Sequence, residues 1–254
     1  MTDTNSPLLD PIGEARRLTG LAHKEGVTPF LLGGVAIAIR AEGRLPSGLQ
    51  RTYKDLDFVI RRGDASKWAQ ILERAGYTPD VEFNRLHGVQ RLLHYDMVNS
   101  KQLDTFIDVF AMCHVLEFAD RLPVHGETLT PADLLLTKLQ IVEVNDKDLI
   151  DTIALLLMHP LGRSSETVVD LTALAEVLGR DWGWYTTISD NLSKVGHRLT
   201  TVDLDEDQKA IVRDRLDELQ NAFASFPKTL KWRLRAKVGR RIPWYDLPEE
   251  VGEG

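Results

Sequence analysis

The spacing of apolar and polar residues divides this chain into two parts of different character. Up to about residue 120, short apolar runs typical of strands alternate with segments of helical spacing, whereas from Thr130 onward nearly every apolar pattern is helical. This order of elements favours an α+β fold, in which a mixed β-sheet with flanking helices is followed by an all-helical C-terminal region. We place the domain boundary after residue 125, so that the domains span residues 1–125 and 126–254.

The same patterns, together with helix caps and breakers, predict the individual elements. In the first domain they indicate helices over 12–25, 35–42 and 65–75, and strands over 28–32, 54–60, 89–96 and 103–110, of which the last two form an antiparallel hairpin. Glycine, proline and serine in residues 43–53 predict an exposed loop. In the second domain, helices are expected near 131–143, 146–158, 166–178, 182–195, 206–224 and 227–238.

Composition narrows the class of protein. Of the 254 residues, 43% are hydrophobic and 27% are charged, which is ordinary for a globular protein, and no apolar run reaches the roughly 20 residues of a membrane helix. The N-terminal stretch lacks the zones of a signal peptide, and the single cysteine, Cys113, excludes an internal disulfide or a cysteine-based zinc cage. We therefore expect a cytoplasmic protein with no membrane partner, as a monomer or weak dimer. The net charge of -7 disfavours indiscriminate binding to nucleic acid.

Two carboxylates stand close together on one predicted strand. In residues 54–60 the period of two places Asp55 and Asp57 on the same face. Such a pair repels itself unless a cation neutralises it, and hard oxygen ligands suit Mg²⁺, or the similar Mn²⁺. An isolated Asp-x-Asp occurs often by chance, and alone it would be an ordinary solvated strand end.

A glycine pair before this strand changes the interpretation. Gly33 and Gly34 stand at a predicted strand-to-helix turn, where glycines let a phosphate approach the backbone and the helix N-terminus attracts its charge. Taken alone, a tight turn without a ligand is an equally good explanation. Together with Asp55 and Asp57, the pair predicts a phosphate cradle beside a metal site.

Two metal ions that clamp a phosphoryl transfer require a third acid. The predicted strand over 103–110 offers Asp104 and Asp108, which share a face if the strand is regular. We favour Asp104 as the third metal ligand or catalytic base, because it stands at the strand entrance beside a polar turn. Asp108 is the reserve candidate, and its alternative role is a structural acid paired within a loop.

These motifs resemble a known pattern. Leu32-Gly33-Gly34, Asp55-Leu56-Asp57-Phe58 and Leu103-Asp104-Thr105-Phe106 look like the signature of the nucleotidyltransferase superfamily, which has the DNA polymerase β fold. The helical segment over 134–156, LLLTKLQIVEVNDKDLIDTIALL, is similar to the matching region of AbiEii-type toxins and lincosamide-type nucleotidyltransferases. The resemblance covers roughly residues 28–158. It departs in one respect, because residues 35–54 form a longer interval than usual and the loop within it looks inserted.

The resemblance implies a chemistry and a set of partners. It implies transfer of a nucleoside monophosphate from an NTP co-substrate to an acceptor with release of pyrophosphate, and two Mg²⁺ or Mn²⁺ ions as cofactors. The acceptor is a small molecule or an RNA such as tRNA, and the sequence does not choose between them. A non-catalytic nucleotide- or RNA-binding module on the same fold is the alternative.

Several basic residues are assigned to the nucleotide. The resemblance implies that Lys138 and the Lys147-Asp148 pair, with Asp151, hold the triphosphate or order the site, and Lys54, directly before Asp55, joins the residues expected to contact it. Independently of the family, Lys138 is flanked by apolar residues, and burying an unpaired ammonium is costly, so it requires an anion or a path to water. Arg44 and Arg51 of the loop also come within reach of a phosphate, although two solvated loop arginines are the favoured interpretation.

The C-terminal segment 228–246 mixes basic and aromatic residues. Cations neutralise phosphates and rings stack on exposed bases, so this composition is typical of single-strand RNA binding. The preceding predicted helix is acidic, and pairing between the two segments within the chain is the slightly favoured alternative.

Overall fold

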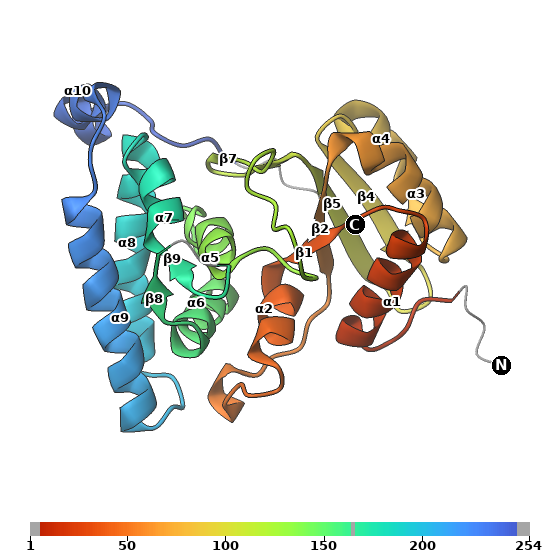
Figure 1. The fold of residues 1–254 in the computed structure, drawn as a ribbon, viewed down its shortest axis with the longest axis horizontal. Helices are drawn as coiled ribbons and strands as arrows, with labels where there is room; N and C mark the ends of the chain where they lie inside the picture. The colour runs from red at the N-terminus through yellow and green to blue at the C-terminus, as the bar shows by residue number, and fades with distance from the viewer. Residues whose placement is uncertain (1–5, 164–165, 248–254) are drawn as a thin grey trace. The chain divides into compact units, whose positions relative to one another are not determined.

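The chain forms two compact units, seen in a computed structural model that describes residues 6–163 and 166–247. Unit 1 takes its described residues from the ranges 1–43, 51–110 and 116–129, and unit 2 takes them from 44–50, 111–115 and 130–254. Unit 1 contains a mixed sheet with helices, and unit 2 is mainly helical (Figure 1). The expected α+β class is therefore confirmed.

A five-stranded sheet organises unit 1. Its strands are β1 (Phe30–Leu32), β2 (Leu56–Ile60), β3 (Thr78–Pro79), β4 (Arg91–Asp96) and β5 (Lys101–Ile107), in the order β1-β2-β5-β4-β3. The β2–β5 pair is parallel and the other neighbours are antiparallel, which includes the predicted β4–β5 hairpin. The β2–β5 pair lies in the middle of the sheet, so polar groups on these two strands have fixed positions relative to one another.

The helices of unit 1 are α1 (Pro11–Lys24), α2 (Gly33–Ala41), α3 (Ala65–Arg74) and α4 (Val81–His87). Trp68 of α3 is fully buried, stacks edge-on against Phe58 at 5.1 Å and donates a 2.9 Å hydrogen bond to Thr105 Oγ1. Phe58 and Thr105 are register partners, and α3 therefore covers their face of the sheet. Asp57 and Asp104, one residue earlier on each strand, point to the opposite face.

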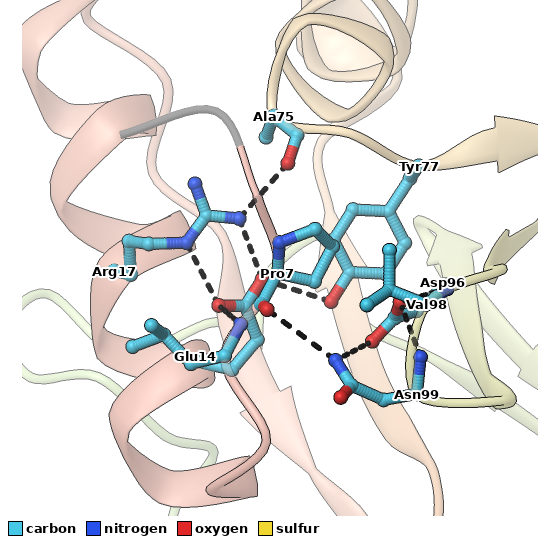
Figure 2. Close-up of polar contacts among 9 residues, drawn as sticks. Pro7, Glu14, Arg17, Ala75, Tyr77, Asp96, Val98 and Asn99 are labelled. Carbon is cyan, nitrogen blue, oxygen red and sulfur yellow. Dashed lines mark hydrogen bonds and ion pairs between the residues drawn. The ribbon is translucent and has the colours of Figure 1, made fainter. Parts of the chain in front are cut away.

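A buried polar network fixes the N-terminal helix (Figure 2). Glu14 is 2% exposed, and its carboxylate accepts hydrogen bonds from Arg17 at 2.7 Å and from the Tyr77 hydroxyl at 2.9 Å. Arg17 also donates to the Ala75 carbonyl at 3.0 Å. Because each polar group has a partner, this burial joins α1 to the end of α3 without an orphaned charge.

Unit 2 is built from helices. They are α5 (Pro131–Leu139), α6 (Asp146–Met158), α7 (Leu171–Leu178), α8 (Trp182–Leu199), α9 (Glu206–Ser225) and α10 (Leu230–Val238). Side-chain caps begin each of them, and a capping box of Asp205 and Gln208 begins α9. In Figure 1, α7, α8 and α9 run side by side, and their buried apolar residues supply much of the core of this unit. None of the described helices is both long enough and apolar enough to cross a membrane.

Four sequence expectations need correction. The predicted strand over 103–110 is interrupted after Ile107, because Asp108 has a φ of 59°; β6 (Val109–Ala111) then pairs with β7 (Val115–Glu117). Helix α4 was not predicted, although the Asp80 side chain caps it at Phe83 N.

The expected exposed loop contains a 3-10 turn, η1 (Ser47–Leu49), whose Leu49 is 2% exposed. Instead of a helix from 166, β9 (Val169–Asp170) pairs with β8 (Leu161–Gly162), and Asp170 caps α7; residues 164 and 165 lie outside the description.

Candidate active site

One row of residues crosses the middle of the sheet in unit 1. Leu32 at the end of β1 pairs with Asp57 on β2, and Asp57 pairs with Asp104 on β5. Partners in register have side chains on the same face, a few ångströms apart. The structure therefore brings Asp57 and Asp104 together on neighbouring strands, next to the point where β1 enters α2.

The glycine turn lies directly against Asp57. Gly33 begins α2 with a φ of +72°, a backbone conformation that favours glycine. A Cβ atom at Gly33 would stand 2.2 Å from Asp57 Oδ2, so a side chain there would displace the carboxylate. Two features therefore require glycine at position 33: the left-handed backbone and the close approach of the Asp57 carboxylate.

The second glycine accommodates an arginine. A Cβ atom at Gly34 would stand 1.9 Å from Arg51 Nη2, and the Arg51 guanidinium lies over the Tyr53 ring, 4.6 Å from its centroid. Sequence reasoning favoured Arg51 as a solvated loop residue, but the structure places it half-buried against the strand-to-helix turn. Arg44, by contrast, is exposed in the segment that belongs to unit 2.

Asp104 is 5% exposed, and both of its oxygens are engaged. Arg91 Nε donates to Oδ1 and Gln102 Nε2 donates to Oδ2, each at 2.7 Å. The Arg91 guanidinium also lies 5.2 Å from the Phe106 ring centroid. Sequence reasoning missed Arg91. The hairpin register would have identified it, because Leu93 pairs with Asp104 and a residue two positions away on the same strand shares its face.

The reserve candidate has a local partner. Asp108 follows the end of β5, and its carboxylate accepts a 3.0 Å hydrogen bond from the Arg62 amide and forms a 3.3 Å ion pair with Arg62 Nε. The left-handed φ at Asp108 breaks the alternation of the strand, so the assumption that Asp104 and Asp108 share a face of one regular strand was wrong. Asp104 is the acid that stands in register with Asp57.

The remaining predicted residues of this region lie just before β2. Lys54 and Asp55 are exposed, and Asp57 is half-buried. Within the described ranges, no three Asp, Glu, His or Cys side chains converge closely enough to form a metal site by themselves. The carboxylate oxygens of Asp55 and Asp57 are of the type that Mg²⁺ binds, and Mg²⁺ commonly completes its coordination with phosphate oxygens and water. The acids of this region do not form a ready-made cage of three carboxylates.

Unit 2 contains the predicted lysine in a salt-bridge cluster. Lys138 Nζ lies 2.7 Å from Asp148 Oδ1 and 2.9 Å from Asp151 Oδ2, and its side chain is 13% exposed. Burial alone would lower the pKa of Lys138, but the charges of Asp151 and Asp148 outweigh it and raise the pKa to about 12. Lys138 is therefore charged at neutral pH and joins α5 to α6. Lys147 is exposed on the first turn of α6.

Comparison with known proteins adds one finding. A family model described as "Uncharacterised nucleotidyltransferase" matches residues 11–190, a span that includes the glycine turn, Asp55 before β2, Asp57 on β2, Asp104 on β5 and the Lys138 cluster. No curated protein and no solved structure matches the chain. The narrower likeness to AbiEii-type and lincosamide-type enzymes stays a prediction. Because the match covers well over half of the 254 residues, the chain belongs to this nucleotidyltransferase family.

Proposed function

We propose that this protein transfers a nucleoside monophosphate from an NTP to a hydroxyl or phosphate oxygen of a small-molecule or RNA acceptor and releases pyrophosphate. The observation that carries the proposal is the position of Asp57, whose carboxylate lies against Gly33 and in register with Asp104. Acidic oxygens and the N-terminus of a helix thus occur side by side, as nucleotidyl transfer requires.

The glycine turn supports the phosphate-binding part of the proposal. Leu32, the N-cap of α2, has no side chain that satisfies the first amides of the helix. These amides and the positive end of the helix dipole are suited to a phosphate oxygen. The Arg51 guanidinium against Gly34 adds a full positive charge at the same turn. We assign these groups to the triphosphate.

The metal part rests on Asp55 and Asp57. These residues would hold Mg²⁺ or Mn²⁺, which when bound neutralises phosphate charge and stabilises the leaving oxygens. Asp57, half-buried and fixed by its strand register, orients the site, while the exposed Asp55 supplies a second oxygen donor at the strand entrance. Lys54 stands beside them, where its ammonium can reach a phosphate.

The contacts of Asp104 suggest a different role from that of a free metal ligand. Arg91 and Gln102 occupy one hydrogen-bonding position on each oxygen, so a direct metal bond would compete with two donors. We assign Asp104 as an oriented carboxylate that accepts the proton of the attacking acceptor hydroxyl or fixes the charge beside Asp57. The attacking oxygen then bonds to the α-phosphorus as the bond to pyrophosphate breaks.

The Lys138 cluster is assigned to ordering. One ammonium faces two carboxylates, so the cluster carries a net charge of -1 and does not by itself attract a triphosphate. Of the two roles that the family resemblance implies, the pairing of Lys138 with Asp148 and Asp151 favours the one that holds α5 and α6 in place. Lys147, exposed on α6, remains the candidate for direct phosphate contact.

A second candidate function is a non-catalytic nucleotide-binding module. The engagement of both Asp104 oxygens by neighbouring side chains is the observation that favours it. Calorimetry with an NTP, with and without Mg²⁺, separates the two possibilities. The enzyme should bind the NTP more tightly with Mg²⁺, whereas a binding module without a metal site should show little metal dependence.

Incubation with α-labelled NTPs and with either total RNA or a panel of small hydroxyl-bearing molecules tests the proposal directly. The wild-type protein should transfer label only when Mg²⁺ or Mn²⁺ is present, and Asp57→Asn should reduce the rate by about 100-fold or more, since a positioned charge is lost. Asp120→Asn, which changes an exposed acid in a turn of unit 1, is the matched control and should retain activity. An Asp57→Asn protein of normal activity would refute the assignment.

A further inference from the structure

Positive charge is concentrated in the last described segment of unit 2. The segment from Lys228 to Arg241 carries seven lysines and arginines, and no acidic residue stands between Glu218 and Asp246, although the whole chain has a net charge of -7. The favoured sequence interpretation, pairing with the acidic helix α9, is not what the structure shows. No ion pair joins α9 to α10 within the described ranges, and Arg240 instead pairs with Asp190 of α8 at 2.7 Å.

A cavity of about 440 Å³ opens between the start of α8 and α10, a volume in the range of small-ligand pockets. Three indole rings and three cationic side chains line it: Trp182, Trp232, Trp244, Arg180, Lys231 and Arg235. Four of the five tryptophans of the chain belong to unit 2, and three of those four are gathered here. Aromatic faces and cations together are the two components that bind an unpaired nucleotide.

The three cationic side chains of this cavity differ in their contacts. Arg235 stacks over Trp182, 4.7 Å from the ring centroid, and donates to the carbonyls of Gly239, Ile242 and Pro243, so it fixes the turn after α10. Arg180 and Lys231 form no ion pair with any described residue and are exposed. They therefore remain available to phosphates.

The other polar groups of the wall agree with an anionic ligand. Asp181 is the acid that lines the cavity, and its carboxylate is engaged in capping α8 at Gly183 N and Trp184 N. The indole Nε1 of Trp232 is buried and has no hydrogen-bond acceptor among the described residues. With Arg180, Lys231 and Arg235 against Asp181, the wall has a net charge of +2.

Helix α10 itself is unusual for a packed element, because none of its residues is buried, and Leu230 and Leu234 are 73% and 54% exposed. Its cations and apolar residues do not separate onto two faces, as they would in a helix that lies on a membrane surface. Gathered rings and scattered cations favour a flexible anionic chain with stacking bases.

We propose that this cavity is a second site, which binds unpaired nucleotides of single-stranded RNA by stacking a base between its indole rings and pairing flanking phosphates with Arg180 and Lys231. The identification of that RNA as the acceptor rests on the proposed function. The binding site itself requires neither an NTP nor a metal ion.

Fluorescence anisotropy of a labelled 12-nucleotide single-stranded RNA, titrated with the full chain at several salt concentrations and without NTP or Mg²⁺, tests the site. Trp232→Leu should weaken binding about 10-fold, while Trp232→Phe, which keeps a ring, should restore most of it. Lys231→Gln should reduce the slope of log affinity against log salt by about 0.7, the value for one phosphate of a single strand. Lys24→Gln, an exposed cation at the end of α1, removes the same charge elsewhere and should leave the slope unchanged.

Equal RNA affinity in the wild-type and Trp232→Leu proteins, or binding to anionic lipid vesicles in place of RNA, would overturn the proposal. The transfer assay then separates the two claims. If RNA binding depends on Trp232 but no label is transferred to any acceptor, the proposed function is contradicted and the RNA-binding site is still supported. Undiminished labelling of RNA by Trp232→Leu contradicts the identification of the bound strand as the acceptor.

Discussion

Substitution of Gly33 offers a test in which backbone strain and site geometry can be separated. Gly33 and Gly26 have nearly the same left-handed backbone, with φ of +72° and +74°. Alanine at either position incurs the same conformational penalty, about 1–2 kcal/mol. At Gly26 an added Cβ meets no atom within 4 Å, whereas at Gly33 it would stand 2.2 Å from Asp57 Oδ2. Gly26→Ala is therefore a matched control for strain alone.

The contact at Gly33 sets the expected effect on activity. Restoring ordinary van der Waals contact requires the Asp57 carboxylate oxygen, now 2.2 Å from the added Cβ, to retreat to at least 3.4 Å, and a displacement of about 1 Å at a reacting site already costs about 100-fold in rate. In urea titrations followed by circular dichroism, we expect Gly26→Ala to lose about 1–2 kcal/mol of unfolding free energy, and Gly33→Ala to lose at least as much because Asp57 must also move. Only Gly33→Ala should also lose about 100-fold in transfer of α-labelled nucleotide. Equal activity of the two variants would show that the carboxylate at Gly33 does not matter for the reaction.

Three further predictions concern stability. The His94 ring is fully buried, and its two nitrogens have no hydrogen-bond partner among the described residues. Burial lowers the pKa of His94 from 6.5 to about 4, so the unfolded chain gains the proton first as the pH falls below 6.5; wild-type protein should therefore lose about 2 kcal/mol more stability between pH 7 and pH 5 than His94→Leu, measured by urea unfolding. Lys138→Met leaves the carboxylates of Asp148 and Asp151 together without the ammonium that pairs with both, and should lower the unfolding free energy by about 3–5 kcal/mol. An unchanged urea midpoint would contradict the pairing. Glu14→Gln keeps the volume and an oxygen that can accept the Tyr77 hydroxyl, but it removes the charge that pairs with Arg17, and should cost about 1–3 kcal/mol in thermal unfolding. A loss below the error of the measurement would count against the network.

The sequence by itself determined the elements that depend on local chemistry. The strand, glycine turn and helix around Gly33 follow from apolar spacing and from the glycines. The pairing of Asp55 with Asp57 on one face stays a prediction, because β2 begins at Leu56, after Asp55. The hairpin of β4 and β5 and the cap of α5 at Thr130 are also local features, formed by residues close together in the chain. For the same reason the α+β class was predictable.

Tertiary structure alone decided which side chains meet. Asp104 faces Asp57 because β2 and β5 pair in parallel across a long connection, and no local pattern specifies that register. The φ of 59° at Asp108, which removes this acid from the strand, depends on hydrogen bonds of its backbone to Ile60 and Phe118. Contacts such as these are non-local and are set by packing of the whole unit. A period of two in the sequence therefore predicts which acids share a face only where the strand stays regular, and the fold decides where it does, as the break at Asp108 shows.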